Sequence, residues 1–204
     1  MTKIIEKKQI VLMYIFASAV YFMSYFTRIN YNTVLVEIST AENILHSLLA
    51  LPLTASFITY GLGQTISGWL GDKVDPFRLI SLGLGLSALM NILLPIFPKL
   101  YVMTMLWAVN GFAQALIYPP LMKLTSHYLS EGNYAKTCLF VTIGSHAATL
   151  LMYLAAPMKI ALSSWKLVFF SSFGCAVAFL VIWQIYAGSM KKKYGKPSEE
   201  PKTK

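Results

Sequence analysis

Acidic residues are scarce in this chain of 204 residues. Asp and Glu together number eight, against seventeen Lys and Arg, and charged residues make up only 12% of the sequence. The usual share in a soluble domain is about 25%. Hydrophobic residues make up 56%, and a soluble protein of this composition would expose large apolar patches. The scarcity of charge therefore excludes an ordinary soluble domain, and the apolar content excludes a disordered chain.

Cysteine and the motifs of enzymes are also nearly absent. The only cysteines, Cys138 and Cys175, both lie inside apolar stretches, where they provide neither a disulfide framework nor the spacing of a metal site. The sequence has no paired carboxylates, no nucleophile elbow, no phosphate-cradling loop and no HExxH motif. We therefore expect no enzymatic activity, no catalytic residues, no metal and no cofactor.

Long apolar stretches are what the sequence does contain. Six of them reach the length of about 20 residues that a helix needs to cross a bilayer, at 10–36, 47–70, 77–97, 100–128, 135–158 and 166–188. They predict an all-α membrane protein with six transmembrane helices. Lys3, Lys7 and Lys8 before the first stretch also suit a cleaved signal peptide. We favour a membrane span, because the apolar run continues and five more follow.

The basic residues lie in short runs between the apolar stretches, so we expect a membrane rather than a nucleic-acid partner. If the N-terminus is cytoplasmic, twelve of the seventeen Lys and Arg fall on the cytoplasmic side and three outside, as the positive-inside rule requires. We predict a protein of the cytoplasmic membrane with both termini inside. Residues 1–9 form the N-terminal segment and residues 189–204 a disordered basic tail or linker.

Arg28 is the most informative residue, because it lies about 7 Å past the middle of the first apolar stretch. A cation at such a depth costs about 2.5–3.5 kcal/mol or more. None of the eight acids falls in the middle of a stretch, so the chain supplies no internal counter-ion. Arg28 reaches the headgroups, pairs with backbone carbonyls or another subunit, or faces a water-filled cavity that receives an anion. We favour the cavity, because a guanidinium binds phosphate or carboxylate bidentately.

Further polar side chains lie at helical spacing in the apolar stretches. Such residues line a binding site or simply hold helices together, and His146, near the centre of the fifth stretch, is open to both interpretations. The candidates besides Arg28 are Tyr21, Tyr25, Tyr60, Gln64, Gln114, Tyr118 and His146.

The segment Gly68-Trp-Leu-Gly-Asp72-Lys73-Val-Asp-Pro-Phe-Arg78 resembles the signature loop of the major facilitator superfamily, between its second and third helices. The resemblance implies one half-bundle of that fold, built from two inverted three-helix repeats at 10–98 and 99–188. It also implies that Gly68, Asp72, Lys73 and Arg78 latch the cytoplasmic side.

Two other segments, 21–30 and 110–120, are similar to the first and fourth helices of the organophosphate:phosphate antiporter family, which includes glycerol-phosphate and hexose-phosphate transporters. This resemblance implies that Arg28 grips phosphate and that His146, Tyr21, Tyr25, Tyr60 and Gln114 line the site. Gln64 stands where close relatives carry Lys and Tyr118 where they carry Trp. These departures leave the particular anion open.

The family has twelve helices, and six are expected here. The resemblance therefore implies one half of a secondary active transporter that exchanges a phosphorylated small molecule for inorganic phosphate by alternating access. Such a half needs a second six-helix bundle, from a separate chain or by self-association, unless it is an incomplete product. The alternatives are a non-transporting sensor of sugar phosphates, a vestigial membrane protein and a proton-coupled transporter of a neutral solute.

Overall fold

The computed structural model describes residue 4 and residues 6–195, and all regular structure in them is helical. This confirms the predicted all-α fold. In chain order the elements are α1 (Lys7–Ile29), the short 3-10 helix η1 (Asn32–Val34), α2 (Leu35–Glu42), the short 3-10 helix η2 (His46–Leu49), α3 (Ala50–Gly71), α4 (Pro76–Leu93), α5 (Leu100–Ala115), α6 (Tyr118–Tyr128), α7 (Glu131–Leu162) and α8 (Trp165–Tyr194).

Five segments in the described part of the chain are long and apolar enough to cross a membrane. They correspond to five of the six predicted spans: Lys7–Glu42, Pro76–Leu93, Leu100–Tyr128, Glu131–Leu162 and Trp165–Tyr194. The remaining predicted span, 47–70, forms α3, which has 22 residues and no charged side chain. Its Gly, Ser, Thr and Gln residues lower its mean hydropathy, but α3 lies beside α5 in the same bundle.

Several predicted boundaries were wrong. The first and fourth spans are each interrupted, after Ile29 and after Ala115. The second break precedes Pro119 and Pro120, since proline begins a helix well but has no N–H for its interior. In contrast, α7 continues through Pro157 to Leu162. A membrane helix tolerates proline where neighbouring helices and side chains satisfy the backbone groups that the proline leaves unpaired.

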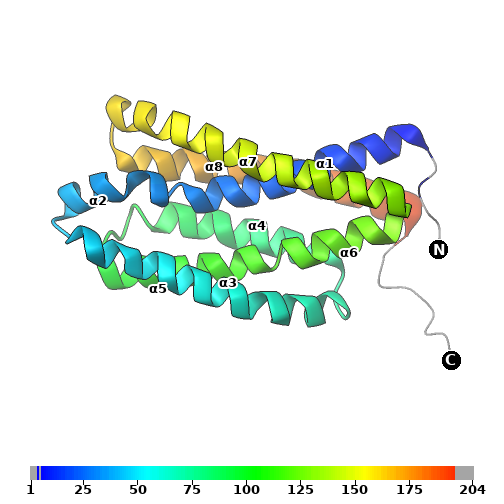
Figure 1. Ribbon diagram of the computed structural model, residues 1–204, viewed down its shortest axis with the longest axis horizontal. Coiled ribbons are helices and arrows are strands. Elements are labelled where there is room, and N and C mark those ends of the chain that lie inside the picture. The colour runs from blue at the N-terminus through cyan, green and yellow to red at the C-terminus, as the bar shows by residue number, and fades with distance from the viewer. Residues whose placement is uncertain (1–3, 5, 196–204) are drawn as a thin grey trace.

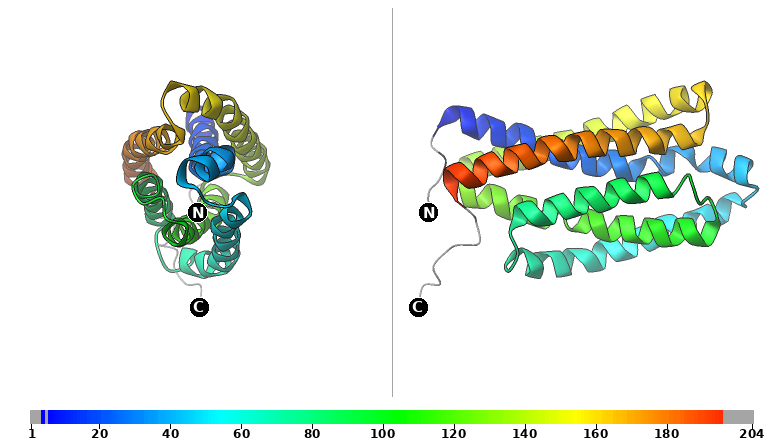
Figure 2. Two further views of the ribbon diagram at one scale, coloured as in Figure 1. Left: turned by 90° about the vertical axis from the view of Figure 1, so that its left-hand side faces the viewer. Right: turned by 180° about the vertical axis from the view of Figure 1, so that it is seen from behind.

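The long helices run side by side along the bundle (Figure 1), and the end-on view shows the other helices packed around α1 and α2 (Figure 2, left). The most extensive pairings are α3 with α5 and α1 with α7, followed by α4 with α8. The described chain begins and ends at the same end of the bundle, where Lys193 Nζ lies 2.6 Å from Glu6 Oε2. The chain therefore crosses the bundle lengthwise an even number of times.

Glycines allow close packing in the two most extensive helix pairings. A Cβ atom on Gly111 of α5 would lie 2.2 Å from the carbonyl oxygen of Ser56 in α3, and one on Gly144 of α7 would lie 2.7 Å from that of Ser18 in α1. These contacts are with backbone, which cannot rotate away. By comparison, a Cβ on Gly61 would meet no atom within 4 Å.

Candidate functional site

Arg28 lies in the last turn of α1, next to the break that follows Ile29. The carbonyl groups at the end of a helix carry partial negative charge and favour a cation there. The sequence places Arg28 within a continuous span, so this contribution was not expected. It offsets only part of the cost of the charge, because a helix end supplies about half an elementary charge.

The guanidinium of Arg28 faces aromatic rings rather than acids. Its Cζ atom lies 4.4 Å from the ring centroid of Tyr60 and 5.2 Å from that of Phe57, both on α3. Within the described residues, Arg28 takes part in no ion pair and no hydrogen bond to a protein group. Cation–π contacts stabilise the charge, but the five N–H donors of the guanidinium remain available for a ligand.

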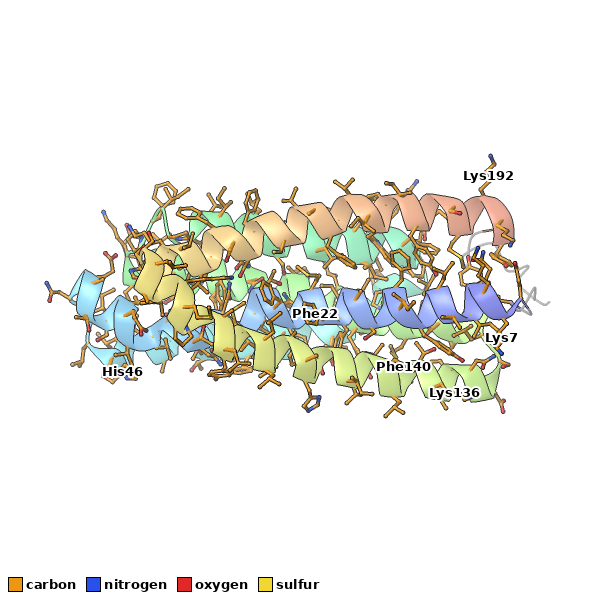
Figure 3. All side chains as sticks on the ribbon, turned by 90° about the horizontal axis from the view of Figure 1, so that it is seen from above. Lys7, Phe22, His46, Lys136, Phe140 and Lys192 are labelled. Atoms are coloured by element: carbon orange, nitrogen blue, oxygen red, sulfur yellow. The ribbon has the colours of Figure 1, made fainter. Side chains whose placement is uncertain are left out.

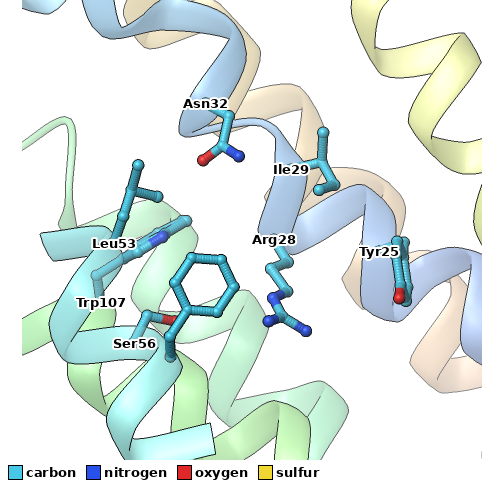
Figure 4. A pocket seen from close by; sticks show the side chains of 8 residues that line it. Tyr25, Arg28, Ile29, Asn32, Leu53, Ser56 and Trp107 are labelled. Atoms are coloured by element: carbon cyan, nitrogen blue, oxygen red, sulfur yellow. The ribbon is translucent and has the colours of Figure 1, made fainter. Parts of the chain in front are cut away.

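A cavity of about 180 Å³ lies beside Arg28, between α1, α3 and α5. Figure 4 shows Arg28 extending from α1 toward the side where Leu53 and Ser56 of α3 lie, with Tyr25 on the other side of Arg28. The cavity has both apolar walls and polar groups at its rim. The guanidinium is half-buried and lies next to this space. This geometry fits the binding of a small anion better than it fits an Arg28 side chain that extends outward to the lipid headgroups.

Four predicted tyrosines gather next to Arg28, and we call them the tyrosine cluster: Tyr21, Tyr25, Tyr60 and Tyr118. The ring centroid of Tyr21 lies 5.1 Å from the ring centroids of Tyr25 and Tyr118. The hydroxyl of Tyr21 interacts with those of Tyr25 and Tyr60. The structure thus brings tyrosines from α1, α3 and α6 together, and the cluster meets the guanidinium through Tyr60, whose ring faces it, and Tyr25, which lines the same cavity.

Two of the three remaining candidates, Gln64 and His146, are not part of the tyrosine cluster. Gln64 is half-buried on α3, one turn beyond Tyr60. His146 is exposed on α7, and its Nδ1 lies 2.8 Å from the carbonyl oxygen of Thr142 in the same helix. Neither residue lines the cavity beside Arg28 or faces its guanidinium.

Gln114 lies in a buried polar network between α1, α4 and α5. Its amide nitrogen donates to Thr27 Oγ1 at 3.1 Å and to Ser87 Oγ at 2.8 Å, and its oxygen accepts from the hydroxyl of Ser24. Asn91 on α4 also donates to the Thr27 carbonyl at 3.0 Å. Both amide hydrogens of Gln114 are therefore used within the protein. Gln114 thus joins α1, α4 and α5 next to Arg28, and its contact with a ligand stays a prediction.

We expect Gln114→Leu to destabilise the protein by about 1–2 kcal/mol, because several buried hydroxyl groups lose their partner. The thermal unfolding midpoint of the purified protein in detergent measures this. Thr104→Val is the matched control on α5, since Thr104 bonds only to the Leu100 carbonyl of its own helix at 2.8 Å. Equal midpoints for the two variants would contradict a structural role for the network.

The predicted latch residues lie around the turn between α3 and α4. Lys123 of α6 binds this turn, with Nζ 2.6 Å from Asp72 Oδ1 and 2.9 Å from the Gly71 carbonyl oxygen. The ammonium of Lys73 lies 3.7 Å from the ring centroid of Trp69. Gly68 and Arg78 are exposed. The turn is therefore fastened to α6.

The hydrogen bond and charge of Lys123 hold the pKa of the Asp72 carboxyl below its ordinary value of 3.8. A lowered carboxyl pKa contributes stability above the ordinary value, and that contribution is lost as the pH falls through the lowered one. The Asp72 carboxyl therefore stays ionised across the range of about pH 5 to 8 in which unperturbed histidine titrates.

Sequence reasoning missed a second ion pair at the same turn. Asp75 caps α4 by accepting a hydrogen bond from the Phe77 amide at 3.0 Å, and its other oxygen lies 2.6 Å from Lys191 Nζ on α8. The capping role could have been found from Asp75-Pro76, which is a typical helix start. The pairing could not, because residues 189–204 were predicted to be a disordered tail, whereas α8 extends to Tyr194. Residues 196–204 of that tail lie outside the described residues.

Six of the eight cavity residues were also missed: Ile29, Asn32, Leu53, Ser56, Phe57 and Trp107. The Oδ1 atom of Asn32 is buried and, within the described residues, has no hydrogen-bond partner. Asn32 follows Arg28 by four residues, and this spacing was the one available signal. Phe57 and Trp107 are apolar residues among many, so nothing in the sequence distinguishes them.

Apolar helices that surround an unpaired guanidinium beside a cavity define a class of protein. This is a polytopic membrane protein with an unpaired arginine inside the bundle, an arrangement expected of a solute carrier.

Comparison with known families agrees. Residues 17–204 match the Major Facilitator Superfamily, and the chain belongs to this superfamily. The resemblance recognised at residues 68–78 is confirmed.

Individual relatives include a membrane sensor protein and two proteins named for the transport of phosphate esters. The chain is 30% identical over 111 residues to the membrane sensor protein UhpC of Salmonella typhimurium, a match that covers 54% of this chain and 25% of the relative. It is 25% identical over 113 residues to a probable hexose phosphate transport protein of Chlamydia trachomatis, covering 55% and 25%. It is 26% identical over 141 residues to the glycerol-3-phosphate transporter of Bacillus subtilis, covering 66% and 32%. The matches thus span a quarter to a third of the relatives' length.

Proposed function

We propose that this chain binds inorganic phosphate or a phosphorylated small molecule at Arg28, as one half of a transporter that exchanges the two by alternating access. The observation that carries the proposal is the unpaired guanidinium of Arg28 at the edge of a cavity of about 180 Å³. The intramembrane cation costs about 2.5–3.5 kcal/mol. A phosphate that binds bidentately would offset this cost.

The relatives support phosphate esters as the substrate class, since two of them carry hexose phosphate or glycerol-3-phosphate in their names. The tyrosine cluster supports it as well, because phenol hydroxyls donate to phosphate oxygens and bond to the hydroxyls of a sugar or glycerol. We assign Gln64 and His146 to the wall of the same binding path, where a second bundle faces the first.

The architecture proposed with this function is two inverted three-helix repeats, 10–98 and 99–188, that rock against a second six-helix bundle. Two helix pairings support such a repeat, because each joins the first helix of one repeat to the second helix of the other. These are the pairings of α1 with α7 and of α5 with α3. The Glu6–Lys193 pair supports termini on one side, which we take to be the cytoplasmic side of the cytoplasmic membrane. The turn with Asp72 would then latch that side.

Phosphate counterflow tests the proposal. The chain is reconstituted into proteoliposomes loaded with phosphate, alone and together with a candidate second six-helix bundle. We expect saturable uptake of external labelled phosphate only when both bundles and internal phosphate are present. Absence of both flux and phosphate binding would overturn the proposal.

A second candidate function is a membrane sensor of phosphate esters. The similarity to UhpC, at 30% identity, favours it, and the geometry of Arg28 serves a sensor equally well. Phosphate binding to the purified protein without any counterflow would select the sensor over the transporter.

A further inference from the structure

A second cavity, of about 550 Å³, opens on the outer surface of α1 between α7 and α8. We call it the α1–α7–α8 groove. Its walls are almost entirely apolar and include Val11, Ile15 and Phe22 of α1, Phe140 and Ile143 of α7, and Phe179 of α8. It is separate from the cavity beside Arg28 and independent of the proposed function.

The groove faces away from the interior of the bundle. Val11, Ile15 and Phe22 are each two positions from a buried residue of α1, Met13 or Val20, and two positions are about 200° around a helix. Val11 is 45% exposed and Ile15 is 56% exposed. In a membrane-spanning bundle, this outward apolar hollow meets either lipid chains or another apolar protein surface.

The length of the groove matches one leaflet of a bilayer. Val11 and Phe22 are eleven positions apart, which is about 16 Å along a helix. Half of a hydrocarbon core of about 30 Å is about 15 Å. A single acyl chain of one leaflet thus has the length that the groove provides.

Exposed lysines lie at one end of the groove only. Lys7 precedes Val11 by four residues on α1, and Lys136 precedes Phe140 by four on α7, so each lies one turn beyond the apolar wall on the same helix face. Figure 3 shows Lys7 and Lys136 at the same end of α1 and α7, with Phe22 and Phe140 further along. Both lysines are exposed.

The nearby acids do not cancel this charge. Glu6 is paired with Lys193 at 2.6 Å, and Glu131 is exposed at the start of α7. Lys8 adds a further exposed cation beside Lys7. The mouth is also held in shape, because the Tyr14 hydroxyl donates to Asn133 Oδ1 at 2.7 Å and the Tyr14 ring stacks on Phe140 at 5.4 Å.

We propose that the α1–α7–α8 groove binds one anionic glycerophospholipid, with an acyl chain along the apolar wall and the headgroup phosphate between Lys7 and Lys136. A neutral zwitterionic lipid fits the apolar wall equally well but gains less from two cations. Juxtamembrane lysines attract anionic headgroups strongly enough for two of them to change affinity about tenfold or more.

Native mass spectrometry of the full chain, titrated with phosphatidylglycerol or phosphatidylcholine, tests this proposal. We expect phosphatidylglycerol to bind about tenfold more tightly than phosphatidylcholine. The double variant Lys7→Gln/Lys136→Gln should bind both lipids about equally. Lys192→Gln is the matched control, because Lys192 is exposed at the same end but on α8 (Figure 3), and it should keep the preference.

A variant that fills the groove separates the contribution of the apolar wall from that of the lysines. Ala147 is exposed and lines the groove, so Ala147→Phe should weaken binding of both lipids without changing any charge. Leu150→Phe, on the exposed surface of α7 outside the groove, should leave binding unchanged.

Three results would overturn the proposal. The first is an equal affinity of the wild-type chain for both lipids, and the second is an unchanged preference in the lysine double variant. The third is covalent crosslinking of Ile15→Cys to a second protein bundle in phosphatidylglycerol vesicles, since the groove would then be a protein interface. If Ala147→Phe does not fold, the lysine variants alone decide.

Discussion

Arg28→Lys should weaken the binding of inorganic phosphate by about 10- to 100-fold, the largest functional effect expected of any conservative substitution in this chain. Lysine keeps the positive charge but replaces a planar fork of five donors by a point charge. A charge-assisted hydrogen bond is worth about 1.5–3 kcal/mol, which corresponds to that factor. The Tyr60 and Phe57 rings that now face a flat guanidinium also fit an ammonium less well.

Isothermal titration of the purified chain with phosphate measures this effect directly, and it applies to a transporter and to a sensor alike. Lys99→Gln serves as the control, because it removes a whole charge from an exposed residue at the start of α5 and should not alter affinity. Wild-type affinity in the Arg28→Lys protein would show that the guanidinium does not contact the anion.

Gly111→Ala is expected to have the largest effect on stability. The added Cβ would lie 2.2 Å from the Ser56 carbonyl oxygen and 2.6 Å from Thr59 Oγ1. The Ser56 carbonyl belongs to the backbone and cannot rotate away. The helices α3 and α5 must therefore move apart where they pack against each other. Overpacking of this kind costs about 1–3 kcal/mol, and occasionally more.

The thermal unfolding midpoint in detergent, followed by the loss of monodisperse protein on size exclusion, measures this effect. Gly61→Ala on α3 is the matched control. A Cβ there meets no atom within 4 Å, and alanine favours a helix by about 1 kcal/mol over glycine. The midpoint should fall for Gly111→Ala and stay level or rise for Gly61→Ala. Equal shifts in the two variants would contradict the close packing of α3 on α5.

A glycine in the sequence does not by itself predict where two helices pack closely. Gly61 and Gly63 are two residues apart, and the sequence gives no reason to rank them. In the structure, a Cβ on Gly63 would lie 2.8 Å from the Ala115 Cβ, whereas Gly61 faces open space. Which of the two allows close approach depends on the rotation of α3 about its own axis.

The membrane helices and the unusual status of Arg28 follow from the sequence. Apolar runs of about 20 residues leave no alternative to helices that satisfy their own backbone hydrogen bonds. Eight acids can all be counted and located, so the missing counter-ion is visible without coordinates. Tyr21, Tyr25 and Arg28 lie within two turns of one helix, and helical periodicity alone places them on one face.

Contacts between helices were decided only by the tertiary structure. Tyr60 lies against Arg28, whereas Gln114 lies in a buried polar network and His146 lies on the surface. Helical periodicity fixes angles within a helix, but a helix that is apolar all round has no strong preference for its buried face. The rotation of each helix, and hence the partners of each polar side chain, is set by close packing of small residues against neighbouring backbones. That information belongs to pairs of helices and is absent from any single one.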